Sequence, residues 1–185
     1  IMGDDELGPW RVLLAEQYAS LSRWRDAAQA LQSITPHAAR RIPQLSFAQL
    51  CVRVVELWLQ DLPTHVAEAE QAIKRANSAI LDERDNKALV HELWSYHARV
   101  LAIQHRFMEA AARYMDLPRA DMYAAVYAII SPPSAQRTSM LTRLAQRASA
   151  WPFAQTLHHA AEGRFLRPAD LEALAPFLGL ALIHS

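Results

Sequence analysis

The chain has 185 residues, and its 19 basic and 19 acidic side chains give a formal net charge of zero. It has 34 alanines and 24 leucines but only four glycines, which favours helices and leaves no glycine-rich loop for a nucleotide phosphate. The zero net charge gives no support to nucleic acid as a main partner, and the longest apolar run, 122–130, is too short for a membrane span.

Prolines and capping residues divide the chain into helix-sized segments. A break at Ser22-Arg23 separates the first two helices, and Thr35-Pro36 ends the second because the residue before a proline avoids the helical region. Pro118 is expected to start a helix that Pro132-Pro133 stops. The predicted helices are at about residues 9–22, 24–34, 47–58, 66–80, 89–103, 107–117, 118–131, 134–147, 152–162 and 168–178, with a polar loop through 41–43 and a charged linker at 82–87.

Several residues are expected to fix how these helices end and pack. Gly163 and Gly179 each follow a predicted helix, where a left-handed cap favours glycine. Cys51, the single cysteine, lies on an apolar stripe and is predicted to be a core residue, in keeping with a reducing, intracellular setting. The first helix carries one apolar stripe, which comprises Trp10, Leu13, Leu14, Tyr18 and Leu21.

Two pairs of helices share one spacing of small and large residues. The intervals are 3, 9 and 4 residues both in Ala15, Tyr18, Ala27, Leu31 and in Ala98, Leu101, Ala110, Tyr114. These offsets are those of the packing positions in tetratricopeptide repeats, where small residues let paired helices approach closely. The sequence therefore predicts an all-α, right-handed helical-hairpin solenoid in one domain over residues 1–185, with a tighter repeat part at 9–117 and shorter helices at 118–179.

Candidate chemistry is sparse along the chain. His158 and Glu162 stand four residues apart on one predicted helix, but a third metal ligand at matching spacing is missing, so we expect no metal, cofactor or catalytic residue. Charge is unevenly distributed, with net −4 over residues 56–92 and net +4 over residues 93–147. Such a division either steers partners or reflects two ordinary solvated faces.

Several segments, in order, resemble subunit 4 of the COP9 signalosome, a family of PCI proteins. The clearest are Trp24-Arg25-Asp26-Ala27-Ala28, Tyr96-His97-Ala98-Arg99-Val100-Leu101 and Arg106-Phe107-Met108-Glu109-Ala110-Ala111. Further matches are residues 134–141, 163–166 and 171–174, so the resemblance covers about residues 10–178. Family members are longer and continue into a winged-helix module that is not found in this sequence. Together with the opening Ile1-Met2, this suggests a fragment covering the helical-repeat region.

The resemblance implies a non-catalytic scaffold subunit of the cytoplasm and nucleus. Its partners would be other signalosome subunits and a neddylated cullin–RING ligase, which it helps to dock for deneddylation by a separate metalloprotease subunit; neither nucleic acid nor a membrane is expected. The alternatives are a PCI scaffold subunit of the proteasome lid or of translation initiation factor 3, and a metal-dependent enzyme using His158 and Glu162. Arg99 and Arg106, seven residues apart, are predicted to lie near one concave stripe that contacts a partner protein.

Overall fold

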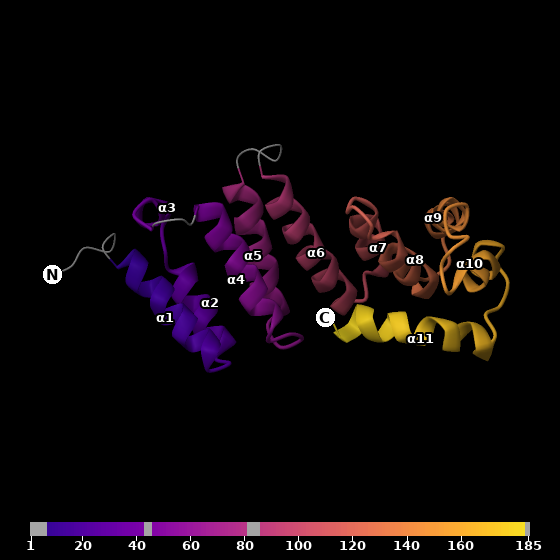
Figure 1. Ribbon diagram of the computed structural model, residues 1–185, viewed down its shortest axis with the longest axis horizontal. Coiled ribbons are helices and arrows are strands. Elements are labelled where there is room, and N and C mark those ends of the chain that lie inside the picture. The colour runs from indigo at the N-terminus through magenta and orange to yellow at the C-terminus, as the bar shows by residue number, and fades with distance from the viewer. Residues whose placement is uncertain (1–6, 43–45, 81–85, 184–185) are drawn as a thin grey trace. The chain divides into compact units, whose positions relative to one another are not determined.

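The computed structural model describes residues 7–42, 46–80 and 86–183 (Figure 1). These residues form eleven α-helices packed in adjacent pairs, and the described ranges contain no strand. The predicted all-α helical-hairpin fold is confirmed. The helices are α1 (Gly8–Ser20), α2 (Trp24–Gln32), α3 (Pro36–Ala39), α4 (Phe47–Leu59), α5 (Val66–Ala79), α6 (Lys87–Ile103), α7 (Phe107–Met115), α8 (Asp121–Ile130), α9 (Ala135–Ala145), α10 (Ala154–Ala161) and α11 (Pro168–Ile183).

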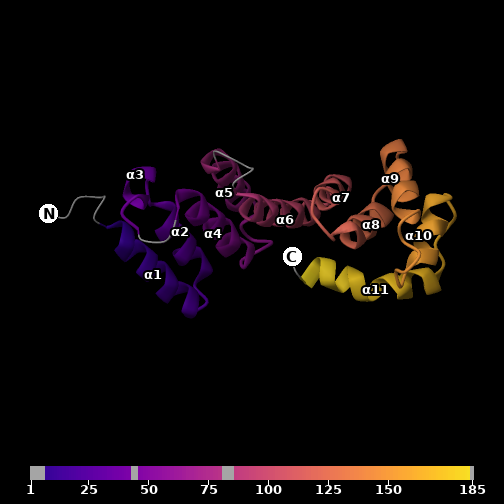
Figure 2. The same cartoon turned by 45° about the horizontal axis from the view of Figure 1, so that its top comes forward.

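The chain divides into two compact units, residues 1–96 and 97–185, and the division falls within α6. In the first unit α1 pairs with α2, α4 pairs with α5, and α2 packs against α4. In the second unit α7 pairs with α8 and α9 with α10, while α11 returns along α8, as Figure 2 shows. The prediction of one domain over residues 1–185 stays a prediction.

Both predicted helix pairs place their small residues in the packed interior. Ala27, Ala98 and Ala110 have no exposed surface, and Ala15 is 3% exposed. The large residues Leu31, Leu101 and Tyr114 are also buried, so the spacing of 3, 9 and 4 residues marks packing positions in each unit. A methyl side chain lets two helix backbones approach more closely than a leucine does, which explains the alanine content of the sequence.

The same turn ends the first helix of both pairs. Ser22 and His105 adopt left-handed backbone angles, with φ of 56° and 59°. The next residue in each turn, Arg23 or Arg106, donates its backbone N–H to the carbonyl five residues earlier, at 2.8 and 2.9 Å. This is the Schellman motif, and Gly163 with φ 72° forms it again after α10.

Two arginines cap helix C-termini that belong to neighbouring elements. Arg75 of α5 donates to the carbonyl oxygens of Gln32 and Ile34 at the end of α2, at 2.5 and 2.8 Å. Arg137 of α9 donates to the carbonyls of Ala128 and Ile129 at the end of α8, at 3.0 and 3.1 Å. A positive charge at the negative end of a helix dipole stabilises these contacts between elements.

Three details differ from the sequence prediction. A short helix, α3, begins at Pro36 because the Thr35 side chain accepts the backbone N–H of Ala38 at 3.2 Å and so caps its start. Pro118 lies in a turn rather than at a helix start, and α8 begins only at Asp121. The helix predicted to end before Gly179 continues to Ile183, so that glycine forms no left-handed cap. Residues 43 and 82–85 of the predicted loop and linker lie outside the described residues.

Ser22→Gly should stabilise the chain. A left-handed conformation costs an ordinary residue about 1–2 kcal/mol, whereas glycine adopts it freely but gains chain entropy on unfolding, so we expect a net gain of about 0.5–1 kcal/mol. Urea melts measure the free energy of unfolding. Ser20→Gly, in the last turn of α1, is the control and should lose about 0.5 kcal/mol. A loss of stability in Ser22→Gly would contradict the assigned turn.

Ala110→Leu should destabilise the chain by about 1–3 kcal/mol, because extra methyl groups have no space at a fully buried helix contact. Glu109→Leu adds bulk on the exposed side of the same helix and removes only an exposed ion pair with Arg106, so we expect a change within about 0.5 kcal/mol. Thermal and urea melts of the two variants check the register. Equal effects, or a larger effect at Glu109, would show that the helix is rotated from its assigned position.

Candidate functional site

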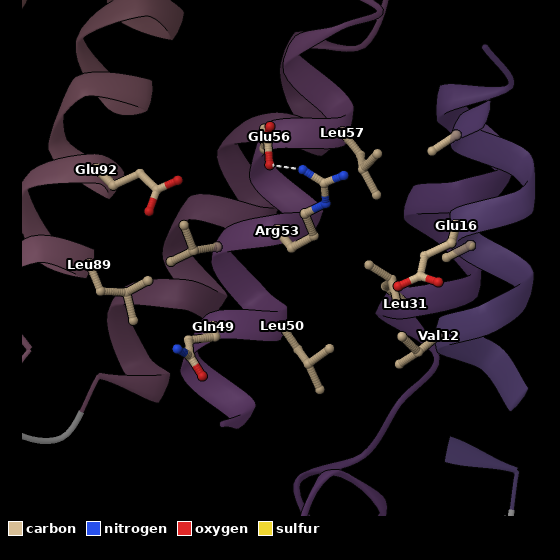
Figure 3. Close-up of a pocket in the computed structure, with 13 residues that line it drawn as sticks. Val12, Glu16, Leu31, Gln49, Leu50, Arg53, Glu56, Leu57, Leu89 and Glu92 are labelled. Atoms are coloured by element: carbon tan, nitrogen blue, oxygen red, sulfur yellow. Dashed lines mark hydrogen bonds and ion pairs between the residues drawn. The ribbon is translucent and has the colours of Figure 1, made fainter. Parts of the chain in front are cut away.

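The described part of residues 1–96 contains a groove of about 420 Å³ at α1, α4 and α6 (Figure 3). α4 crosses its middle, with α1 on one side and the first turns of α6 on the other. Buried aliphatic side chains from neighbouring helices form its floor, and no aromatic residue lines it. The lining residues are Val12, Ala15, Glu16, Ala19, Leu31, Gln49, Leu50, Val52, Arg53, Glu56, Leu57, Leu89 and Glu92.

The charged residues of the groove lie at its rim. Arg53 and Glu56 form an ion pair with each other along α4, so their charges largely compensate (Figure 3). Glu16 on α1 and Glu92 on α6 are exposed, and the Glu92 carboxylate accepts a hydrogen bond from the Tyr96 hydroxyl at 2.8 Å. The rim therefore carries three carboxylates against one guanidinium, around an apolar floor.

The apolar stripe predicted on the first helix is present, but most of it faces outward. Trp10, Leu13, Leu14 and Leu21 are 61%, 52%, 45% and 67% exposed, while Ala15 on the opposite side of α1 is buried. The helix thus packs through Ala15 and presents Trp10, Leu13 and Leu14 to solvent, whereas Tyr18 of the predicted stripe is half-buried. Contiguous exposed apolar residues of this kind are typical of protein interaction surfaces.

Arg99 lies in a half-buried position on α6, in the second unit. Its positive charge acts on Tyr114 and Tyr127, whose rings stack at 5.5 Å with an angle of 3°. Burial raises the pKa of Tyr127 to about 12, because the phenolate would lose its hydration, and Arg99 opposes this shift. The half-buried side chain therefore lies close enough to both tyrosines for its charge to act on them.

Arg106 occupies a different kind of position from Arg99. It follows the end of α6, at the N-cap of α7, so the two arginines do not share a helical stripe. Its guanidinium is exposed and donates from Nε and Nη2 to the Glu109 carboxylate at 2.7 and 2.5 Å. This bidentate pair lowers the pKa of Glu109 and holds the arginine at the hairpin turn.

Within the part of the chain that the structure describes, the pair His158 and Glu162 gains no further metal ligand. His158 is exposed, and the Glu162 carboxylate pairs with Arg164 at 2.6 Å. Over the described ranges, no group of three or more His, Cys, Asp or Glu side chains is placed to hold a metal ion.

Cys51 is buried as predicted, and burial raises the pKa of its thiol. No helix in the described ranges is long and apolar enough to cross a membrane.

A polar cluster that the sequence did not predict joins α10 to α11. The carboxylate of Asp170 lies 3.2 Å from Nδ1 of His159 and 3.4 Å from the Thr156 hydroxyl. The backbone N–H of Arg167 also donates to Asp170 at 2.8 Å, which caps the start of α11 and lowers the pKa of the carboxyl. An aspartate at the third position after the N-cap was the sequence signal for this contact.

Comparison with known proteins supports the predicted resemblance. The chain is 32% identical over 156 residues to COP9 signalosome complex subunit 4 of Caenorhabditis elegans, covering 75% of this chain and 37% of that protein. The chain is related to the signalosome subunit 4 family. The protein of the same name from Arabidopsis thaliana is 31% identical over 108 residues, or 58% of this chain and 26% of the relative.

The chain spans well under half the length of the signalosome subunit 4 proteins that it matches. No protein-family model matches it. The residues quoted for the resemblance include the buried Ala98 and Ala110, and Arg106, which follows the left-handed residue of a Schellman turn.

Asp170→Asn should make the free energy of unfolding less dependent on pH in the acidic range. The folded pKa of Asp170 lies below its ordinary 3.8, chiefly because the Arg167 N–H binds the charged form, and His159 adds to this. A lowered folded pKa gives stability that is present above the unfolded pKa and is lost as the pH falls through the folded pKa. Urea melts below about pH 4 should show a steeper loss in the wild type than in Asp170→Asn.

Glu172→Gln, an exposed change on the same helix, is the control and should follow the wild-type pH profile. Parallel acid profiles for the wild type and Asp170→Asn would contradict the assigned contact with Arg167.

Proposed function

We propose that this chain is part of a non-catalytic scaffold and interaction subunit of the COP9 signalosome. The observation that carries the proposal is its similarity to subunit 4 proteins of that complex in an animal and a plant. The packing of the chain as helical hairpins and the exposed apolar stripe on α1 support it, because both provide extended surfaces for other proteins.

The partners that we propose are other signalosome subunits and a neddylated cullin–RING ligase. The chain helps to assemble the complex and to dock this ligase, while a different subunit removes the ubiquitin-like modifier from the cullin. We place this activity in the cytoplasm and nucleus. The protein-contacting residues that we propose are Arg99 and Arg106, of which Arg106 is the more exposed.

Affinity purification of the full-length protein that contains this chain tests the assignment. A tagged form expressed in cells should recover the other signalosome subunits at constant stoichiometry, as measured by quantitative mass spectrometry. Recovery of proteasome-lid or initiation-factor subunits instead would assign the chain to another PCI complex. Recovery of none of these assemblies would contradict a scaffold role.

Arg106→Glu should weaken the binding of a neddylated cullin–RING ligase to the assembled complex by roughly fivefold, because it reverses a charge that faces an acidic partner surface. Arg23→Glu is a matched control, since Arg23 follows the same turn in the first hairpin and pairs with Asp26 as Arg106 pairs with Glu109. Surface plasmon resonance of both variants measures the affinities.

Both substitutions lie on the surface and should change the free energy of unfolding by no more than about 0.5 kcal/mol. Equal affinities for Arg106→Glu and Arg23→Glu would remove Arg106 from the proposed interface while leaving the assignment to the complex untouched. Arg99→Glu would change stability as well as partner binding, because this half-buried side chain lies near the stacked tyrosines.

A further inference from the structure

We infer that the groove at α1, α4 and α6 binds a basic amphipathic helix of a partner protein. The argument begins with the composition of its walls. Buried leucines and alanines form the floor, and carboxylates stand at the rim, which is the arrangement of an apolar interface core with a polar edge. Its volume of about 420 Å³ is enough for a small number of inserted side chains.

The walls exclude the other common ways in which proteins bind peptides. The described residues of this unit are helical and offer no sheet edge for an added strand. Proline-rich segments need an aromatic-lined groove, and none of the described residues that line this one is aromatic. Phosphorylated or acidic segments need an arginine cluster, whereas Arg53 is engaged by Glu56. The mode that remains is a helix that inserts aliphatic side chains between neighbouring helices.

The charge of the rim decides which helix fits. Glu16 forms no ion pair within the described residues, and Glu92 interacts with the neutral Tyr96 hydroxyl. These two carboxylates come from α1 and α6, on either side of the Arg53–Glu56 pair (Figure 3). Lysine or arginine residues flanking the apolar face of a bound helix would meet both of them. An acidic helix would face uncompensated repulsion.

The groove belongs to one unit and needs no contribution from residues 97–185. Leu31, Leu50, Val52 and Leu57 of the groove are part of the core of that unit, so they are held in place by packing rather than by a ligand. Such a surface is formed before a partner arrives, which lowers the entropic cost of binding. The inference specifies a partner for the proposed interaction role and rests on that role.

Fluorescence anisotropy with a labelled model peptide tests the inference on the 185-residue chain. The probe is a synthetic 15-residue helix with leucines along one face and lysines beside them, and a matched peptide carries glutamate in place of each lysine. We expect saturable binding of the lysine peptide, weakened by added salt, and no measurable binding of the glutamate peptide. Equal binding of the two peptides would overturn the inference.

The double variant Glu16→Gln, Glu92→Gln locates the binding site. Glutamine removes the charge but keeps an acceptor for Tyr96, so the fold should be unaffected. We expect at least a fivefold loss of affinity for the lysine peptide and a weaker dependence on salt. The matched control, Glu162→Gln with Glu172→Gln, makes the same charge change at exposed sites outside the groove and should stay within twofold of the wild type.

An unchanged affinity in the groove double variant would show that the peptide binds elsewhere, such as on the α1 stripe, and would overturn the inference. Failure here is distinguishable from failure of the proposed function. The peptide titration uses the isolated chain, whereas the affinity purification detects whole signalosome subunits, so either result can fail while the other succeeds.

Discussion

Close packing at alanine is the constraint on which both units depend. The helices have between 4 and 17 residues, and helices of this length gain most of their stability from tertiary packing. Fully buried alanines such as Ala27, Ala69 and Ala110 bring neighbouring backbones near each other. Each alanine buries little apolar area, so the gain at each contact comes largely from dispersion between closely spaced backbones. The angle and register of every hairpin are therefore sensitive to single methyl groups.

A few polar contacts at helix ends complement this alanine packing. Arg75 and Arg137 each reach across to the last carbonyls of another helix, and Asp170 links the start of α11 to α10. These contacts satisfy backbone or side-chain groups at helix ends, which have no intrahelical partner. They also specify which helix is the neighbour, because an alanine surface alone would pack with many helices. The alanines let helix backbones pack closely, and the polar groups at helix ends determine which helices become neighbours.

The sequence predicts the positions of the helices better than it predicts which neighbours cover each helix face. Helical periodicity, proline positions and the repeated spacing at Ala15 and Ala98 predict the helical segments and the hairpins, since these signals are local. The start of α8 could not be predicted from Pro118, because the turn around Arg119 with φ 62° precedes the helix. The outward direction of the α1 stripe was also inaccessible, because periodicity locates a stripe without saying which neighbour covers it. Tertiary contacts decide both questions.

The groove is the clearest case of a site that the sequence did not predict and that only the fold assembles. Glu16, Arg53 and Glu92 are separated by nearly forty residues at each step, and none belongs to a recognisable motif. The acidic excess over residues 56–92 includes Glu92, but sequence alone cannot distinguish a binding rim from a solvated face. The fold brings the three side chains to one surface, where residues of α1, α4 and α6 line the same groove. Of these exposed rim residues Arg53 is paired with Glu56, so Glu16 and Glu92 are the ones available for recognition, while the buried leucines beneath them hold the helices together.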